Sequence, residues 1–365
     1  MHLPLASILK NAADYAIALQ HHDGSFPAGH NGPYYDPETP VRNTAHYLYL
    51  FADLYEKHHQ ENYRAAAERA VDYLLSRQAR PFGYTFHCRN SEAKDRSNGL
   101  VGQAWVIEAL VKASEVLRRQ DCYDLAEEVF LLHPWDRSVS LWNKVDVDGA
   151  ALSYDRTFNH QLWFAAAASL LDKSSAAGER AEAFVRNIVP TVQRYPDGTI
   201  YHISRMGSVV HYLANGPKAF AREVKSRYVG LKNRGQLYSK SVGYHGFNMY
   251  ALALLKRAFP DDRVWGSSMV SEAVAATRNE KFRSVLAESE FGYWYNVSGI
   301  EIAFALQVLE HADANESCMW LQRQFDMTYA SDRDVLSAHA RDADTARARI
   351  YQACRVAETL EADCD

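Results

Sequence analysis

The chain has 365 residues, of which 47% are hydrophobic and 23% are charged, a composition typical of a folded protein with enough apolar material for a large core. Its formal net charge of -5 and its pI near 6.3 indicate no excess of positive charge of the kind that binds nucleic acids or anionic membranes. The composition therefore argues against nucleic-acid binding.

Long segments with apolar residues at helical spacing, separated by clusters of Gly, Pro and Asn, predict a mostly α-helical protein. Five of these segments open with a small polar loop and then become strongly apolar. In chain order they begin at Arg42, Asn98, Phe158, Gly243 and Tyr295. Amphipathic segments with one charged face lie between them, as expected for helices that face solvent. The alternation predicts an all-α fold of about six helical hairpins, an (α/α)6 toroid, with the apolar segments as its inner ring.

Two regions depart from this pattern. Residues 197–240 combine turn residues with some alternation of the β type, which predicts a small hairpin or lid over one mouth of the toroid. Residues 339–360 fit either a last inner helix or a polar peripheral cap. No low-complexity linker divides the chain, so we expect a single domain over residues 1–365.

The five cysteines are scattered and odd in number, and none has a partner at metal-binding spacing, so we expect reduced thiols and neither a metal nor a cofactor. The N-terminal twenty residues lack a basic region followed by a long apolar region, and no run approaches eighteen apolar residues. We therefore expect a cytoplasmic protein that is not inserted in a membrane. The sequence makes no prediction of oligomeric state.

The aromatic content is unusual, with 22 Tyr and 7 Trp, many of them in turn-like segments beside Asn, His, Gly and Asp. Aromatic rings with polar edges suit sugars, which have apolar CH faces and hydroxyl edges. The alternative is that these rings fill gaps between helices.

The third apolar segment carries Asp155, Asn159 and His160 at or just before its predicted helix start. An Asn amide can neutralise a carboxylate there, and an adjacent His can remove a proton from the carbon next to that carboxylate. The structural alternative is that Asn159 caps the helix and His160 is an ordinary core histidine.

The fourth segment sets Tyr244, His245 and Asn248 within about one helical turn. A Tyr there can act as an acid toward a glycosidic oxygen, and nearby basic residues can bind an acidic substrate. The basic residues in question are Lys232, Arg234 and Lys240. Equally, the Tyr and His can serve only as hydrogen-bond partners of neighbouring helices.

The remaining openings repeat this polar character, and Trp163 and Tyr295 add aromatic faces. The substrate-binding candidates are Asn43, His46, Asn98, Gln103, Trp163, Asn248, Tyr295 and Glu301. Helix capping explains the presence of each Asn at a helix start, but it does not explain the histidines, Gln103 or Glu301 at these positions. We therefore expect the five openings to face one central cavity.

Three segments carry a family resemblance. Residues 94–115 (KDRSNGLVGQAWVIEALVKASE) resemble an inner helix of the N-acylglucosamine 2-epimerase family, a toroid that binds a sugar and uses histidines as acid and base. Residues 158–167 (FNHQLWFAAA) and 243–252 (GYHGFNMYAL) resemble two segments of the alginate lyase toroids. That resemblance implies that Asn159 neutralises a uronate carboxylate, that His160 assists proton abstraction and that Tyr244 acts at the glycosidic oxygen.

The third segment is also similar to the Asp-x-x-x-Asn segment of the unsaturated glucuronyl hydrolases, which would make Asp155 the catalytic acid and base. The chain further resembles toroid proteins encoded with bacterial exopolysaccharide genes.

The leading hypothesis is a carbohydrate-active enzyme on an acidic or amino sugar, a lyase or an epimerase that abstracts a proton next to a carboxylate or carbonyl. In this hypothesis His160 exchanges protons with Tyr244 or His245, while Asn159 and Gln103 hold the anionic intermediate. The alternatives are a hydrolase that uses Asp155 with a second carboxylate, and a non-catalytic glycan-binding protein.

Overall fold

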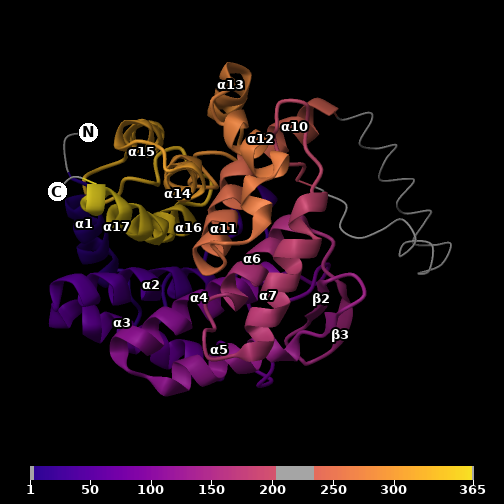
Figure 1. Cartoon of the computed structure of the whole chain (residues 1–365). Coiled ribbons are helices and arrows are strands. Elements are labelled where there is room, and N and C mark those ends of the chain that lie inside the picture. The colour runs from indigo at the N-terminus through magenta and orange to yellow at the C-terminus, as the bar shows by residue number, and fades with distance from the viewer. Residues whose placement is uncertain (1–3, 203–233, 364–365) are drawn as a thin grey trace.

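The computed structural model describes residues 4–202 and 234–363, and helices dominate this described part of the chain (Figure 1). Six of the described helices form a closed inner ring, in which each packs against the next in chain order. These are α2 (Val41–His58), α4 (Gly99–Leu117), α6 (Phe158–Ala168), α11 (His245–Ala258), α14 (Ser298–Glu310) and α17 (Ala353–Asp363). The short turn η4 (Arg349–Gln352), directly before α17, packs on α2 and closes the ring.

The outer helices lie in the chain before the first inner helix and between the others. They are α1 (Leu5–Ile17), α3 (Glu61–Leu75), α5 (Gln120–Leu132), α7 (Ser175–Asn187), α12 (Ser268–Ala276), α13 (Glu280–Glu288) and α15 (Ala314–Thr328). Helix α3 packs against α2 and α4, and α1 contacts both α2 and α17, beside which it lies in Figure 1. The fold is therefore the (α/α)6 toroid that the sequence predicts.

The two sets of helices differ in burial, as their sequences predict. In α6 every residue except His160 is buried, because outer helices cover one side and the other inner helices cover the opposite side. Helix α3 instead buries one stripe at helical spacing, which includes Tyr63, Ala67, Ala70 and Leu74, and exposes its charged residues. Inner helices therefore have few positions from which a side chain can reach solvent.

Short elements connect these helices. They are η1 (Gly32–Tyr34), η2 (Val189–Thr191), α10 (Arg234–Gly243), η3 (Arg263–Gly266) and α16 (Ala343–Ala348). A small antiparallel sheet has the strand order β1 (Trp135–Asp136), β2 (Leu141–Val145) and β3 (Ala151–Tyr154). The sequence predicted no sheet there. In the segment 197–240, the described residues hold an isolated bridge between Arg194 and Ile200 at its edge and the helix α10, and residues 203–233 of the expected lid lie outside the described part.

The polar C-terminal segment supplies the sixth inner position, which the sequence left open. Two of its arginines are buried and each is neutralised by a carboxylate from another inner helix. Arg349 Nη2 lies 2.6 Å from Glu301 Oε1, and Arg355 Nη1 lies 2.6 Å from Glu108 Oε1. Because these charges are paired inside the ring, the segment is polar in sequence and yet buried in the fold.

None of the described helices combines the length and the apolar character needed to span a bilayer. The described cysteines, Cys88, Cys122, Cys318 and Cys354, are free thiols.

Candidate active site

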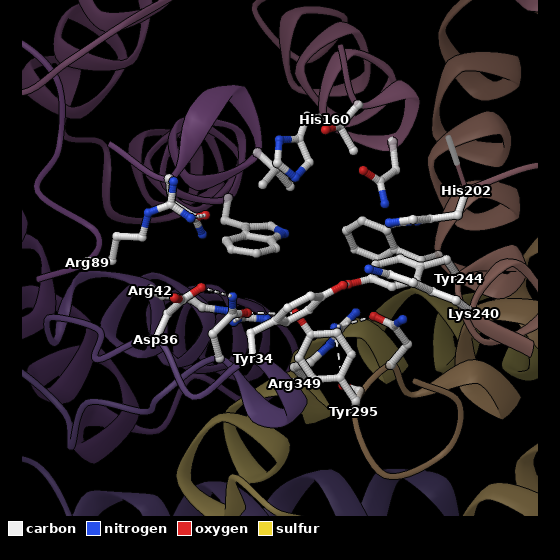
Figure 2. Close-up of a pocket in the computed structure, with 18 of the residues that line it drawn as sticks. Tyr34, Asp36, Arg42, Arg89, His160, His202, Lys240, Tyr244, Tyr295 and Arg349 are labelled. Carbon is white, nitrogen blue, oxygen red and sulfur yellow. Dashed lines mark hydrogen bonds between the residues drawn. The ribbon is translucent and has the colours of Figure 1, made fainter. Parts of the chain in front are cut away.

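A cavity of about 250 Å³ lies where the inner helices begin, and residues at or just before the starts of α2, α4, α6, α11 and α14 contribute to its wall (Figure 2). The five polar openings noted in the sequence thus surround one cavity, together with η4 as a sixth. The lining residues are Asn31, Tyr34, Asp36, Arg42, Arg89, Lys94, Asn98, Val101, Trp105, Thr157, Asn159, His160, His202, Lys240, Tyr244, Phe247, Tyr295, Asn296 and Arg349. The backbone N–H groups of helix starts favour anions, so this arrangement is suited to an acidic ligand.

His160 projects into the cavity from the first turn of α6 and is held by a carboxylate behind it. Its Nδ1 lies 2.8 Å from Asp155 Oδ2, and its side chain is 26% exposed while that of Asp155 is 6% exposed. Burial raises the pKa of Asp155, but the imidazole of His160 and the backbone amide of Thr157 outweigh burial, so this pKa lies well below its usual value. Since an ionised carboxylate only accepts hydrogen bonds, Nδ1 carries the proton and Nε2 is free to act as a base.

The pair is packed tightly against the start of α4. The backbone amide of Leu100 donates to Asp155 Oδ2 at 3.3 Å, and Gly99 has a positive φ of 59°. A Cβ atom at Gly99 would lie 2.4 Å from Asp155 Oδ2 and 3.0 Å from His160 Nδ1. Only glycine therefore allows α4 to approach the Asp155–His160 pair this closely.

Among the described residues, five cationic side chains line the cavity, against one lining carboxylate, Asp36. They are Arg42, Arg89, Lys94, Lys240 and Arg349. Arg42 is also stacked over the ring of Trp105, with its guanidinium carbon 4.2 Å from the ring centroid. A wall of this composition favours a negatively charged ligand.

A chain of phenols forms another part of the wall. The hydroxyls of Tyr34 and Tyr244 lie 2.8 Å apart, and the Tyr295 hydroxyl donates to Asn31 Oδ1 at 2.7 Å. Burial raises the pKa of Tyr34 and of Tyr244 far above the usual value, and the neighbouring Tyr295 raises both pKa values further, although the hydrogen bond to Tyr244 lowers that of Tyr34. Both phenols therefore stay protonated at neutral pH and can donate a proton or a hydrogen bond.

Of the residues singled out in the sequence, six line the cavity. These are Asn98, Asn159, His160, Lys240, Tyr244 and Tyr295. Asp155 lies behind His160. Asn159 is buried, and its Oδ1 has no hydrogen-bond partner among the described residues.

Two catalytic or anion-binding candidates have structural partners instead. His245 is fully buried, with Nδ1 accepting from the Ile200 amide at 3.2 Å and Nε2 lying 2.8 Å from the Ala273 carbonyl oxygen. The Gln103 amide accepts from the Phe86 amide and donates to the Phe86 and Ser97 carbonyls, so it holds the segment before α4. Neither side chain reaches the cavity, which corrects the roles that the sequence suggested for them.

The other substrate-binding candidates also lie behind the wall. Trp163 donates to the Phe247 carbonyl and stacks on the Phe247 ring, and Glu301 is paired with Arg349. His46 is buried with its ring stacked on Tyr351. The candidates that do not line the cavity are Asn43, His46, Gln103, Trp163, Asn248 and Glu301, all of them buried. All six belong to inner helices, but none of them contributes to the cavity wall.

Sequence reasoning missed several lining residues. Arg42 opens α2 beside Asn43, Arg89 and Lys94 belong to the segment before α4, and Arg349 belongs to η4. These residues could have been predicted from the sequence, because a charged residue recurs beside each polar opening. His202, whose ring lies 4.3 Å from that of Tyr244 between centroids, had no such signal because no described helix begins there.

No group of three or more His, Cys, Asp or Glu side chains among the described residues is arranged to hold a metal ion.

The fold is shared with solved structures of sugar-processing proteins. Cellobiose 2-epimerase from Bacillus thermoamylovorans matches with a TM-score of 0.63 and 11% identity over 96% of this chain and 97% of that one. D-mannose isomerase matches with a TM-score of 0.62 and 13% identity over 98% and 97% of the two chains. An inactive variant of the α-1,6-mannanase of Salegentibacter sp. HEL1_6, in complex with α-1,6-mannotetrose, matches with a TM-score of 0.60 and 12% identity over 98% and 100%.

No model of a known protein family matches the chain. A curated relative from Haloferax volcanii, named archaeal glycosylation protein Q, is 39% identical over 360 residues, which cover 96% of this chain and 97% of the relative. The chain belongs to the family of this glycosylation protein.

Proposed function

We propose that the protein is a carbohydrate-active enzyme that removes the proton next to the carboxylate or carbonyl of an acidic saccharide, and that it acts as a sugar epimerase or a lyase. We favour the epimerase. The names of two structures that share the fold, an epimerase and an isomerase, support sugar isomerisation, and the name of the relative supports a role in glycan synthesis.

The observation that carries the proposal is the Asp155–His160 pair in a cation-lined cavity. The carboxylate fixes the tautomer of His160 and stabilises the imidazolium that forms when Nε2 takes a proton. Because His160 is the one accessible residue of an otherwise buried helix, its imidazole is available to a ligand in the cavity.

The anion left after proton removal needs stabilisation from the same wall. Asn159 lies beside His160 in the first turn of α6, and cationic side chains supply positive charge from other elements. In a partly buried cavity such groups stabilise a developing enolate more strongly than they do in water.

The Tyr34–Tyr244 pair is suited to return a proton. Its raised pKa values keep both hydroxyls protonated, and Figure 2 shows Tyr244 and His160 on different sides of the cavity. Donation to the carbon from the face opposite His160 gives epimerisation, and donation to a departing glycosidic oxygen gives elimination.

The hydrolase alternative is less well supported. Asp155 does not line the cavity. Its carboxylate already accepts hydrogen bonds from His160, Leu100 and Thr157. The lining carboxylate, Asp36, is paired with Lys94 at 2.5 Å. Glycoside hydrolysis usually needs two carboxyl groups that face the substrate, one of them protonated.

The test is incubation of the protein with a panel of uronate glycans and amino sugars in deuterated water. We expect deuterium at the carbon next to the carboxylate or carbonyl, detected by NMR, and an inverted or unsaturated product that separates epimerase from lyase. His160→Gln should abolish exchange, and His58→Gln, at an exposed position in the last turn of α2, should not.

Hydrolysis products that carry no deuterium at the carbon next to the carboxylate or carbonyl would instead support the hydrolase. Saturable binding without exchange on every substrate would contradict catalysis and support a glycan-binding protein.

A further inference from the structure

The cations of the cavity wall differ in how they are neutralised. Four of them each have a carboxylate partner in the described structure. These pairs are Arg42 with Glu38 at 3.1 Å, Arg89 with Asp95 at 3.2 Å, Lys94 with Asp36 at 2.5 Å and Arg349 with Glu301 at 2.6 Å. Their charges are largely compensated before any ligand arrives.

Lys240, from α10, is the exception among the described residues. No carboxylate in the described parts of the chain lies within ion-pair distance of its ammonium group, which instead lies over aromatic rings, 4.7 Å from the centroid of Tyr34 and 5.0 Å from that of Phe291. Figure 2 shows Lys240 extending into the cavity beside Tyr244. Ring faces attract a cation, but they replace only part of the hydration that burial removes.

The pKa values of Lys240 and of its neighbour His202 reflect this partial burial. Burial lowers the pKa of Lys240 to about 8, with Glu290 acting in the opposite direction and Lys94 in the same direction as burial. Burial also lowers the pKa of His202 well below its usual value, and the charges of Lys240 and His160 lower it further. The half-buried, neutral His202 therefore lies within the electrostatic reach of both Lys240 and the proposed base.

We propose that Lys240 is the residue that recognises the substrate's carboxylate, and that the substrate is a uronic acid unit bound with this carboxylate against Lys240 and the adjacent carbon toward His160. The part of this inference that places the adjacent carbon toward His160 rests on the proposed function. It follows from charge balance, because a partly desolvated ammonium that has no counter-ion within residues 4–202 and 234–363 gains more from a ligand carboxylate than the four paired cations do.

Binding measurements test this directly, because they require no turnover. The probes are glucuronic and mannuronic acid glycosides, with the matching glucosides and mannosides, which carry a hydroxymethyl group in place of the carboxylate. We expect the wild-type protein to prefer the uronates. Lys240→Gln should weaken uronate binding about ten- to one-hundredfold and neutral-sugar binding less than about twofold. Lys240→Arg should retain part of the preference, and Lys10→Gln, exposed on α1, should retain all of it.

The pH dependence gives a second readout that a merely structural lysine would not produce. A carboxylate beside Lys240 raises the pKa of Lys240, so uronate binding at pH 8.5 should take up a proton, which is measured as a buffer-dependent enthalpy. The groups that face Lys240 are Tyr34, Tyr244, Glu290, Lys94 and His202. Because the tyrosines stay protonated and His202 stays neutral, the uptake should disappear in Lys240→Gln.

Equal loss of uronate and neutral-sugar binding in Lys240→Gln, or a wild-type protein without preference for uronates, would overturn the proposal. A retained preference that depends on Lys240, without deuterium exchange on any substrate, would refute the proposed catalysis and leave the carboxylate site standing.

Discussion

The Nδ1 atom of His160 lies 2.8 Å from Oδ2 of Asp155, and the same carboxylate oxygen accepts the backbone amide of Leu100. Asp155 therefore joins the starts of two neighbouring inner helices, α4 and α6, and at the same time orients the imidazole that we propose as the base.

Asp155→Asn tests this orientation. An Asn side chain can donate to Nδ1, which favours the tautomer with the proton on Nε2 and removes the base. We expect kcat for proton exchange to fall about 10²- to 10⁴-fold with little change in KM. Tyr244→Phe should also lower kcat. A protein that loses glycoside hydrolysis in Asp155→Asn but tolerates Tyr244→Phe would instead be the hydrolase.

Gly99→Ala should displace the Asp155–His160 pair without removing either member. The added Cβ would lie 2.4 Å from Asp155 Oδ2, at a backbone position with φ of 59°. We expect a loss of about 1–3 kcal/mol in the free energy of unfolding together with a lower kcat. Gly178→Ala, in α7 where an added Cβ meets nothing within 4 Å, is the matched control and should be neutral or stabilising. Equal effects of the two substitutions would contradict the close approach at Gly99.

Gln103→Ala should act on stability and not on substrate binding. Its amide is fully buried and satisfies backbone groups of Phe86 and Ser97, which would lose their partner. We expect the free energy of unfolding to fall by about 1–3 kcal/mol, measured by urea denaturation, with KM changed less than about threefold. A raised KM at unchanged stability would restore the substrate-binding role that the sequence suggested.

Acidification should destabilise the fold through buried histidines. Burial lowers the pKa of His133 and of His245 to about 4, although a backbone hydrogen bond opposes this in each case. Below pH 6.5 the unfolded state takes up these protons and the folded state does not, so stability is full above pH 6.5 and falls as the pH drops toward 4. Each histidine should contribute up to about 3 kcal/mol.

His245→Gln should flatten this decline in urea denaturation between pH 7 and 4 and leave proton exchange at pH 7 largely intact. His58→Gln should change neither property. Loss of exchange in a folded His245→Gln protein would show that His245 is catalytic after all.

The inner ring was largely predictable from sequence because burial on both sides demands continuous apolar helices. The predicted starts near Arg42, Asn98, Phe158, Gly243 and Tyr295 agree closely with α2, α4, α6, α11 and α14. The sixth inner position was ambiguous, because its arginines are buried only by virtue of Glu301 and Glu108, which lie far away in sequence. A pattern of hydrophobicity does not show ion pairs between residues that are far apart in the sequence.

The site was predictable only in part for a related reason. His160, Asn159 and Tyr244 stand at helix starts, where spacing relates them to the ring, and they line the cavity. His245 has the same signal, but its neighbours in space, Ile200 and Ala273, satisfy its ring nitrogens. Whether a polar side chain at a helix start faces a ligand or a backbone group depends on rotation about the helix axis, and the sequence fixes that rotation only through packing.

The closure of the ring between η4 and α2 also constrains when the site can form. Arg349 and the contact of η4 with α2 come from the last part of the chain, whereas Arg42 comes from the first inner helix. During synthesis, the first five inner helices can assemble on the ribosome while one side of the cavity is still open. The complete binding wall can exist only after Arg349 has emerged, which is after all five of those helices have been synthesised.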